Sequence, residues 1–259
     1  PRIADVALSI AVSNALRAHP RFSASLSEAV MIWDGSGVHI VDLMIVYSPA
    51  SRVRYGAPGI EAKILSALAD ANSTMANSAV PVRFSLVHLG EVPYIETGKM
   101  TDALMALART TDGIIDDVHA VRDTVGADIV VLIDEDTSSA GLSYLMSVPS
   151  SSFAGNAFSV VYSGALPSLS MTHELGHIFG AHHDRASATG LAAFPYAYGW
   201  RVCDTNLPMF RTVMAYACGS AIAPASPGHS RMLELPTNST CPAAGGFARS
   251  AASNAACRC

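Results

Sequence analysis

The stretch HELGHIFGAHHD, which runs from His173 to Asp184, decides the fold that we expect for this chain. His173 and His177 are four residues apart, so on a helix their side chains lie on the same face, one turn apart. Two imidazoles in this arrangement can bind one zinc ion. Glu174 lies next to them, and its carboxylate can accept a proton from a water molecule at the metal. The spacing therefore predicts a catalytic zinc helix.

A third ligand requires the chain to turn back after the helix. Gly180 supplies that turn, because glycine adopts a positive φ at little cost, and His183 would then face the metal. Three protein ligands leave one position open, which is typical of a catalytic zinc site. The shorter pattern of two histidines and a glutamate also occurs by chance in other sequences. Its extension through Gly180, His183 and Asp184 favours a metal site in this one. His182 is expected to point away from the metal.

The helix has its own start and stop signals. It is predicted over Ser168–Gly180, because Pro167 precedes it, Ser168 is a favourable N-cap and Gly180 is a favourable end. One face of this helix is apolar and is expected to pack against a sheet. The residues of that face are Met171, Leu175 and Ile178.

Upstream of the helix, short apolar runs alternate with segments of helical periodicity. We predict strands at Val38–Tyr47, Val82–Val92, Asp128–Ile133, Leu142–Met146 and Ala157–Tyr162, and helices at Pro58–Ala76, Thr101–Thr110 and Ile114–Val125. This order predicts an α/β fold in which a five-stranded, twisted, mixed sheet is packed with helices. The last strands follow one another without a helical crossover, so one of them should be antiparallel.

Downstream of the helix, Met214 lies in the segment RTVMAY, residues 211–216. On its own, a methionine in an apolar run is a core residue. Together with the zinc helix, the segment resembles the metzincin clan of metallopeptidases, in which a methionine turn lies beneath the metal. The resemblance implies that Met214 packs under the three imidazoles. It also implies that Tyr216 binds the metal reversibly or stabilises an oxyanion; the alternative is an ordinary packed tyrosine.

Four segments extend the resemblance to the bacterial peptidyl-Asp metalloendopeptidase family. They are Val41–Gly59 (VDLMIVYSPASRVRYGAPG), the zinc helix, Tyr196–Arg201 (YAYGWR) and Phe210–Cys218. This resemblance implies a zinc-dependent endopeptidase that hydrolyses proteins on the amino side of aspartate. A pocket for aspartate should hold a cation, for which Arg201 and Arg211 are the candidates. The alternative for each is a surface arginine.

The same resemblance implies a metzincin-like catalytic domain with the zinc helix at the cleft. Residues 37–184 would form the upper subdomain. Residues 185–259 would form a small, irregular C-terminal subdomain with the methionine turn and a cysteine-rich tail. Metzincins usually end with a helix after the methionine turn, but residues 221–259 show no helical pattern. Residues 1–36, which have helical spacing in part, are interpreted as an N-terminal extension or a remnant of a pro-segment.

Two other functions stay open at this point. The chain could be a latent zymogen or a zinc-bearing binding module, with Asp5, Glu28 or Asp34 of the extension as a carboxylate plug on the metal. A different zinc hydrolase, such as an amidase, is disfavoured by the extended ligand motif. Calcium binding is left open.

Composition argues against two further classes. The chain of 259 residues has 16 Lys and Arg against 21 Asp and Glu, without the basic runs that bind nucleic acid. No apolar stretch approaches the ~20 residues that span a bilayer. Only 14% of the residues are charged, which suits an exported enzyme. We therefore expect a secreted monomer with one zinc ion, acting on protein or peptide substrates and without a nucleic-acid or membrane partner.

The five cysteines all lie in the last quarter of the chain, at Cys203, Cys218, Cys241, Cys257 and Cys259. Clustered cysteines in an exported protein usually form disulfides, and an odd number leaves one over. Cys257 and Cys259 are too close to favour a bond with each other, and the pairing is otherwise open. A cysteine zinc site is disfavoured, because no pair has the two-residue gap of such sites.

Overall fold

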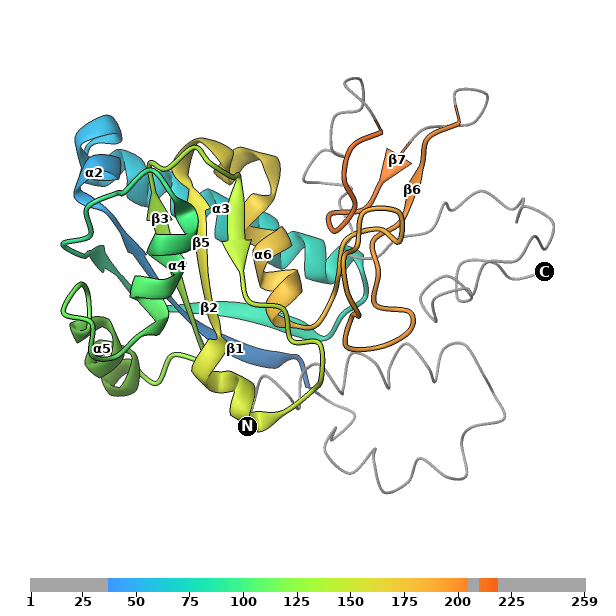
Figure 1. The fold of residues 1–259 in the computed structure, drawn as a ribbon, viewed down its shortest axis with the longest axis horizontal. Helices are drawn as coiled ribbons and strands as arrows, with labels where there is room; N and C mark the ends of the chain where they lie inside the picture. The colour runs from blue at the N-terminus through green and yellow to red at the C-terminus, as the bar shows by residue number, and fades with distance from the viewer. Residues whose placement is uncertain (1–36, 205–209, 219–259) are drawn as a thin grey trace.

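A five-stranded mixed sheet forms the centre of the larger part of the molecule (Figure 1). The computed structural model describes residues 37–204 and 210–218. The strand order is β2-β1-β3-β5-β4, and only β4, at one edge of this sheet, is antiparallel to its neighbour. The strands are β1 (His39–Tyr47), β2 (Val82–Glu91), β3 (Ile129–Asp134), β4 (Gly141–Ser143) and β5 (Phe158–Tyr162). The predicted α/β fold with its mixed sheet is thereby confirmed.

Helices cover both faces of the sheet. They are α2 (Pro49–Tyr55), α3 (Ala57–Asn77), α4 (Met100–Ala108), α5 (Asp117–Val125) and α6 (Ser170–Ile178), with the 3₁₀ helices η3 (Ser151–Asn156) and η4 (Ser163–Ser168). On β1, Leu43 and Ile45 belong to the core shared with α3 and α6, whereas Met44 and Val46 belong to the core shared with α4 and α5. A strand that is buried on both sides has no polar face, which explains the continuous apolar runs in the sequence.

The predicted elements match the observed ones, with differences where segments are short. The strand predicted at Leu142–Met146 is observed as β4, which has three residues, Gly141–Ser143. Helices α2, η3 and η4 have no counterpart among the predicted elements, because helices of six or seven residues are too short to show a periodicity. All the other predicted elements are present within a few residues of their predicted ends.

The prediction that Ser168 caps the zinc helix was wrong. Ser168 ends the 3₁₀ helix η4, and its hydroxyl donates to the carbonyl oxygen of Ala165 at 2.7 Å. The chain then reverses at Leu169, which has a left-handed φ of 64°, and α6 begins at Ser170 without a side-chain cap. The proline and serine thus belong to the preceding turn, and the strained residue that follows them sets the direction of α6.

The predicted end of the zinc helix at Gly180 is observed. Helix α6 closes at Phe179, and Gly180 has a φ of 82°. A Cβ atom on Gly180 would collide with the side chain of Ala193 and lie 2.8 Å from the carbonyl oxygen of Met146. Both the backbone conformation and the close approach therefore require glycine at the turn that leads to His183.

A smaller part follows α6, with little regular structure (Figure 1). Strands β6 (Arg201–Val202) and β7 (Phe210–Arg211) form an antiparallel pair, and Cys203 is bonded to Cys218. The predictions for residues 1–36, including the carboxylate plug, for residues 221–259 and for the other three cysteines lie outside the described residues. The proposed boundaries of the subdomains stay a prediction. Among the described helices, none has the length and apolar character of a membrane span.

Gly180→Ala should lower the free energy of unfolding by about 1–3 kcal/mol, because alanine is strained at this φ and its methyl group has no room. Urea denaturation of the metal-free protein measures this change. Gly155→Ala is the matched control, since Gly155 has no positive φ and no atom lies within 4 Å of the added methyl group. An equal loss of stability in both variants would contradict the prediction.

Candidate metal centre

Three histidine nitrogens converge at the end of α6. The Nε2 atom of His183 lies 3.1 Å from the Nε2 atoms of both His173 and His177. One tetrahedral zinc ion with bonds of about 2.0–2.1 Å would hold its nitrogen ligands about 3.3 Å apart. Within the described part of the chain, these three residues are the one group of His, Cys, Asp and Glu side chains that could hold a metal ion. The donor set and its spacing therefore fit zinc.

Backbone carbonyl groups fix the orientation of two of these rings. The Nδ1 atom of His173 lies 2.8 Å from the carbonyl oxygen of Val213, and that of His177 lies 2.8 Å from the carbonyl oxygen of Ala181. A carbonyl oxygen can only accept, so each Nδ1 carries the proton and donates it. Each Nε2 then presents a lone pair to the shared centre, which is the tautomer that binds a metal.

The same surroundings keep the imidazoles uncharged. Burial lowers the pKa of His177 to about 3, and the neighbouring imidazoles add to this effect. Burial likewise lowers the pKa of His183 to about 4 and shifts that of His173 in the same direction. Because a metal ion competes with protons for the ring nitrogens, the site remains available to a cation below the pH at which free histidine protonates.

Glu174 lies beside the three histidines and is 5% exposed. Its carboxylate accepts a hydrogen bond of 2.6 Å from the hydroxyl of Ser143 on β4. Burial raises the pKa of Glu174 to about 8, and the bond from Ser143 partly offsets this increase. Gly141, on the same strand, leaves room for the side chain, because a Cβ atom there would lie 2.5 Å from the Oε1 atom of Glu174.

The segment that carries Met214 lies next to the histidines, because the carbonyl oxygen of Val213 lies 2.8 Å from the Nδ1 atom of His173. Met214 is fully buried and belongs to the same core as α6. Tyr216 is 49% exposed, and its ring centroid lies 4.2 Å from that of His183 and 6.4 Å from that of His173. The tyrosine is therefore at the edge of the metal centre rather than in the protein core.

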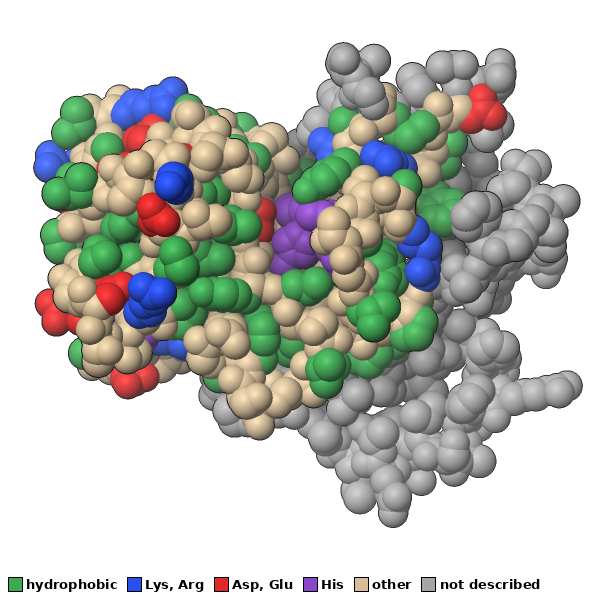
Figure 2. Space-filling model, viewed as in Figure 1, with side chains coloured by type: hydrophobic (Ala, Val, Ile, Leu, Met, Phe, Trp, Pro, Cys, Tyr) green, Lys and Arg blue, Asp and Glu red, His purple; other side chains and the backbone are tan. Residues whose placement is uncertain are grey.

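A cavity of about 570 Å³ opens over the histidines. In Figure 2 the histidine side chains are visible in the hollow between the larger and smaller parts of the molecule. Glu174, Tyr216 and Arg211 all line this cavity. His182 also borders it, but its ring stacks with Tyr198 and lies outside the three-histidine cluster.

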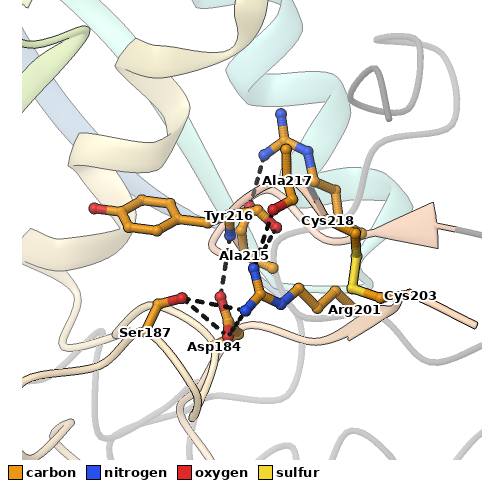
Figure 3. Close-up of a disulfide and its surroundings, with 9 residues drawn as sticks. Asp184, Ser187, Arg201, Cys203, Ala215, Tyr216, Ala217 and Cys218 are labelled. Carbon is orange, nitrogen blue, oxygen red and sulfur yellow. Dashed lines mark hydrogen bonds and ion pairs between the residues drawn. A yellow bond between two sulfur atoms is a disulfide. The ribbon is translucent and has the colours of Figure 1, made fainter. Parts of the chain in front are cut away.

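Arg201, the other predicted pocket residue, does not line the cavity but joins its supporting segments (Figure 3). Its guanidinium forms an ion pair of 3.1 Å with Asp184, and it donates to the carbonyl oxygens of Tyr216 and Ala217. Asp184 also accepts a bond of 3.2 Å from the backbone N–H of Tyr216. These bonds hold the segment that carries His183 against the segment that carries Tyr216.

Comparison with known proteins agrees with this geometry. Residues 39–228 match the sequence profile of metallo-peptidase family M12. The chain belongs to this family. The peptidyl-Asp metalloendopeptidases of Stenotrophomonas maltophilia (strain R551-3) and Xanthomonas campestris pv. campestris are 31% and 32% identical to this M12 chain over 70% of its length. The matches cover 42% and 41% of those proteins, so the chain spans about two fifths of the relatives.

A solved structure shares the fold of this M12 chain. It is described as the structure of a chaperone-substrate complex, and its matching chain gives a TM-score of 0.55 at 19% sequence identity. The match covers 76% of this chain and 31% of that one. At this identity the likeness concerns the fold alone. Membership in family M12 and the three-histidine cluster together indicate a metal site.

Zinc should remain bound as the pH falls below about 6.5, the pKa of an unperturbed histidine, because burial lowers the pKa values of His177 and His183. Protons displace the metal only when they bind the imidazoles, so a lowered pKa moves the loss of metal to lower pH. Dialysis at a series of pH values, followed by metal analysis, measures the midpoint. A midpoint near 6.5 would contradict the prediction, and His183→Ala, which lacks one donor, should fail to retain zinc even at about pH 7.

Proposed function

We propose that this chain is a zinc-dependent endopeptidase, in which His173, His177 and His183 hold one zinc ion and Glu174 is the general base. The observation that carries the proposal is a buried carboxylate beside three histidines that line one cavity, with the Nε2 atom of His183 lying 3.1 Å from those of His173 and His177. Membership in family M12 supports the reaction class. The volume of the cavity, about 570 Å³, suits side chains of an extended peptide.

Zinc, when bound, would supply Lewis-acid chemistry to the scissile carbonyl and to the attacking water. Glu174 accepts the proton of that water and passes it to the nitrogen of the leaving amine. Burial favours the protonated form of this carboxyl group, and the positive charge of a zinc ion beside it would favour the ionised form that accepts the proton. Ser143 keeps one oxygen of Glu174 in place, which leaves the other free for the proton.

One further residue would act on the same peptide, and another would support the metal site. Tyr216 lies beside His183 at the edge of the cavity, so its phenol can donate to the carbonyl oxygen as negative charge develops there. Met214 makes no contact with substrate in this proposal. Its buried side chain belongs to the core beside α6 and supports the imidazoles from below.

We also propose that the enzyme cuts on the amino side of aspartate and acts outside the cytoplasm. The relatives named peptidyl-Asp metalloendopeptidases support the first point. The bond between Cys203 and Cys218 supports the second, because disulfides persist in oxidising compartments. The proposed substrates are proteins and peptides.

Glu174→Gln should keep zinc and lower kcat by about 10²–10⁴-fold, because the amide cannot accept the proton of water. The measurement is hydrolysis of casein and of a short peptide, with zinc content determined on the same sample. His88→Gln is a matched control, since His88 lies on β2, outside the three-histidine cluster. Removing zinc with a chelator should abolish hydrolysis by the unmodified protein, and adding zinc should restore it. Parental activity in Glu174→Gln or in a zinc-free sample would refute the proposal.

Ser143→Ala should lower kcat by roughly 10-fold with little change in zinc content, because Glu174 loses a hydrogen bond to a charged group, worth about 1.5–3 kcal/mol at most. Steady-state kinetics on one peptide substrate measures the effect. Ser143→Thr, which keeps the hydroxyl, should recover part of the activity. An unchanged kcat in Ser143→Ala would show that Glu174 is positioned by other contacts.

A further inference from the structure

We propose that Arg211 determines cleavage specificity, by binding the side-chain carboxylate of the residue that follows the scissile bond. The inference rests on the proposed endopeptidase function and assigns the aspartate preference to a single guanidinium. Arg201, the other arginine that the sequence offered, has a different role.

Arg211 is a cation whose hydrogen-bonding groups are not fully used. Its side chain is partly buried, and its Nε atom is buried without a hydrogen-bond partner. Its Nη1 atom donates to the carbonyl oxygen of Ala215 at 2.6 Å. Among the described residues, no carboxylate forms an ion pair with it. A partly desolvated cation without a counter-charge destabilises the folded protein, so its presence calls for a ligand.

The position of Arg211 makes this loss of folding stability larger. In the β6–β7 pair it lies directly opposite Arg201, and like charges in cross-strand positions are destabilising. Asp184 neutralises Arg201 at 3.1 Å, but it does not reach Arg211. The two arginines therefore differ. Arg201 pairs with Asp184 and joins two segments, whereas Arg211 lines the cavity without a carboxylate partner among the described residues.

The cavity places Arg211 within reach of a bound peptide. Arg211 lines it together with His173 and Glu174, and of the described residues that line it Arg211 is the single Lys or Arg. Two residues further along the chain, the carbonyl of Val213 orients His173, so the cation and the metal centre share one short segment. The peptide bond that reaches the metal would therefore bring its neighbouring side chains to Arg211.

The chemistry of the free donors selects a carboxylate. The unpaired Nε–H and the adjacent Nη2 group form one edge of the guanidinium, and such an edge binds both oxygens of a carboxylate through parallel hydrogen bonds. Because the Nε atom is buried in this structure, the side chain of Arg211 has to shift when this edge meets the carboxylate of a bound peptide. Asparagine has the shape of aspartate but offers one acceptor oxygen and no charge. The proposal thus predicts discrimination between these two side chains rather than a preference for any polar residue.

The test uses two peptides that differ only in Asp or Asn after the scissile bond. The unmodified zinc-loaded protein should cleave the Asp peptide with a kcat/KM about 100-fold higher, the scale of a lost charge-assisted pair. Arg211→Gln should lose most of this ratio by slowing cleavage of the Asp peptide, while the Asn peptide changes by a few-fold. Arg211→Lys, which keeps the charge but not the two-pronged edge, should give an intermediate ratio.

Arg201→Gln is the matched control. It breaks the contacts with Asp184 and should slow both peptides in parallel without changing their ratio. If Arg211→Gln keeps the parental ratio of kcat/KM for the Asp peptide to that for the Asn peptide, the inference is wrong. The role of Arg211 would then be structural, through its hydrogen bond to Ala215.

A binding measurement tests this inference independently of the proposed hydrolysis. Calorimetry with Glu174→Gln should show tighter binding of the Asp peptide, and a second change, Arg211→Gln, should remove that difference. If the unmodified protein cleaves neither peptide but Glu174→Gln binds the Asp peptide selectively through Arg211, the endopeptidase proposal fails, and the part of the inference that remains is the binding of the carboxylate by Arg211. If the protein cleaves or binds both peptides without any Asp preference, the inference about Arg211 is wrong, whereas the endopeptidase proposal is unaffected.

Discussion

Three imidazole nitrogens have to converge on one position, and both parts of the described chain are arranged to satisfy this requirement. Helix α6 supplies His173 and His177 from the larger part, and the turn at Gly180 returns His183 to them. The smaller part contributes the carbonyl oxygen of Val213, which accepts a hydrogen bond from His173 and orients its ring. Burial then keeps the rings uncharged, since an imidazolium ion would have to form with less water around it than in solution. The metal centre therefore lies at the junction of the two parts and depends on each of them.

The sequence predicted those aspects of the site that depend on residues close together in the chain. The four-residue spacing of His173 and His177 places both on one helical face, and Gly180 marked the turn because few other residues adopt its φ. The continuous apolar runs identified strands that are buried on both faces. Such features need no knowledge of the tertiary structure.

Features that depend on contacts distant in the sequence could not be predicted. Ser143 and Glu174 are 31 residues apart, and only the antiparallel position of β4 at the edge of the sheet brings the hydroxyl to the carboxylate. Ser168 looked like a helix cap because its hydroxyl suits that position, but the 3₁₀ turn already used it. Arg201 and Arg211 were equivalent as candidates, since their difference lies in Asp184, which belongs to another segment.

The bond between Cys203 and Cys218, 15 residues apart, closes a covalent ring. This ring contains Arg211, Met214 and Tyr216, whereas the three histidines and Glu174 lie outside it. Opening it by reduction would enlarge the set of conformations available to one wall of the cavity, while α6 and its packing on the sheet would be left unchanged. The ring also contains Val213, whose carbonyl orients His173, so one covalent bond restricts both a wall of the cavity and a histidine of the metal centre.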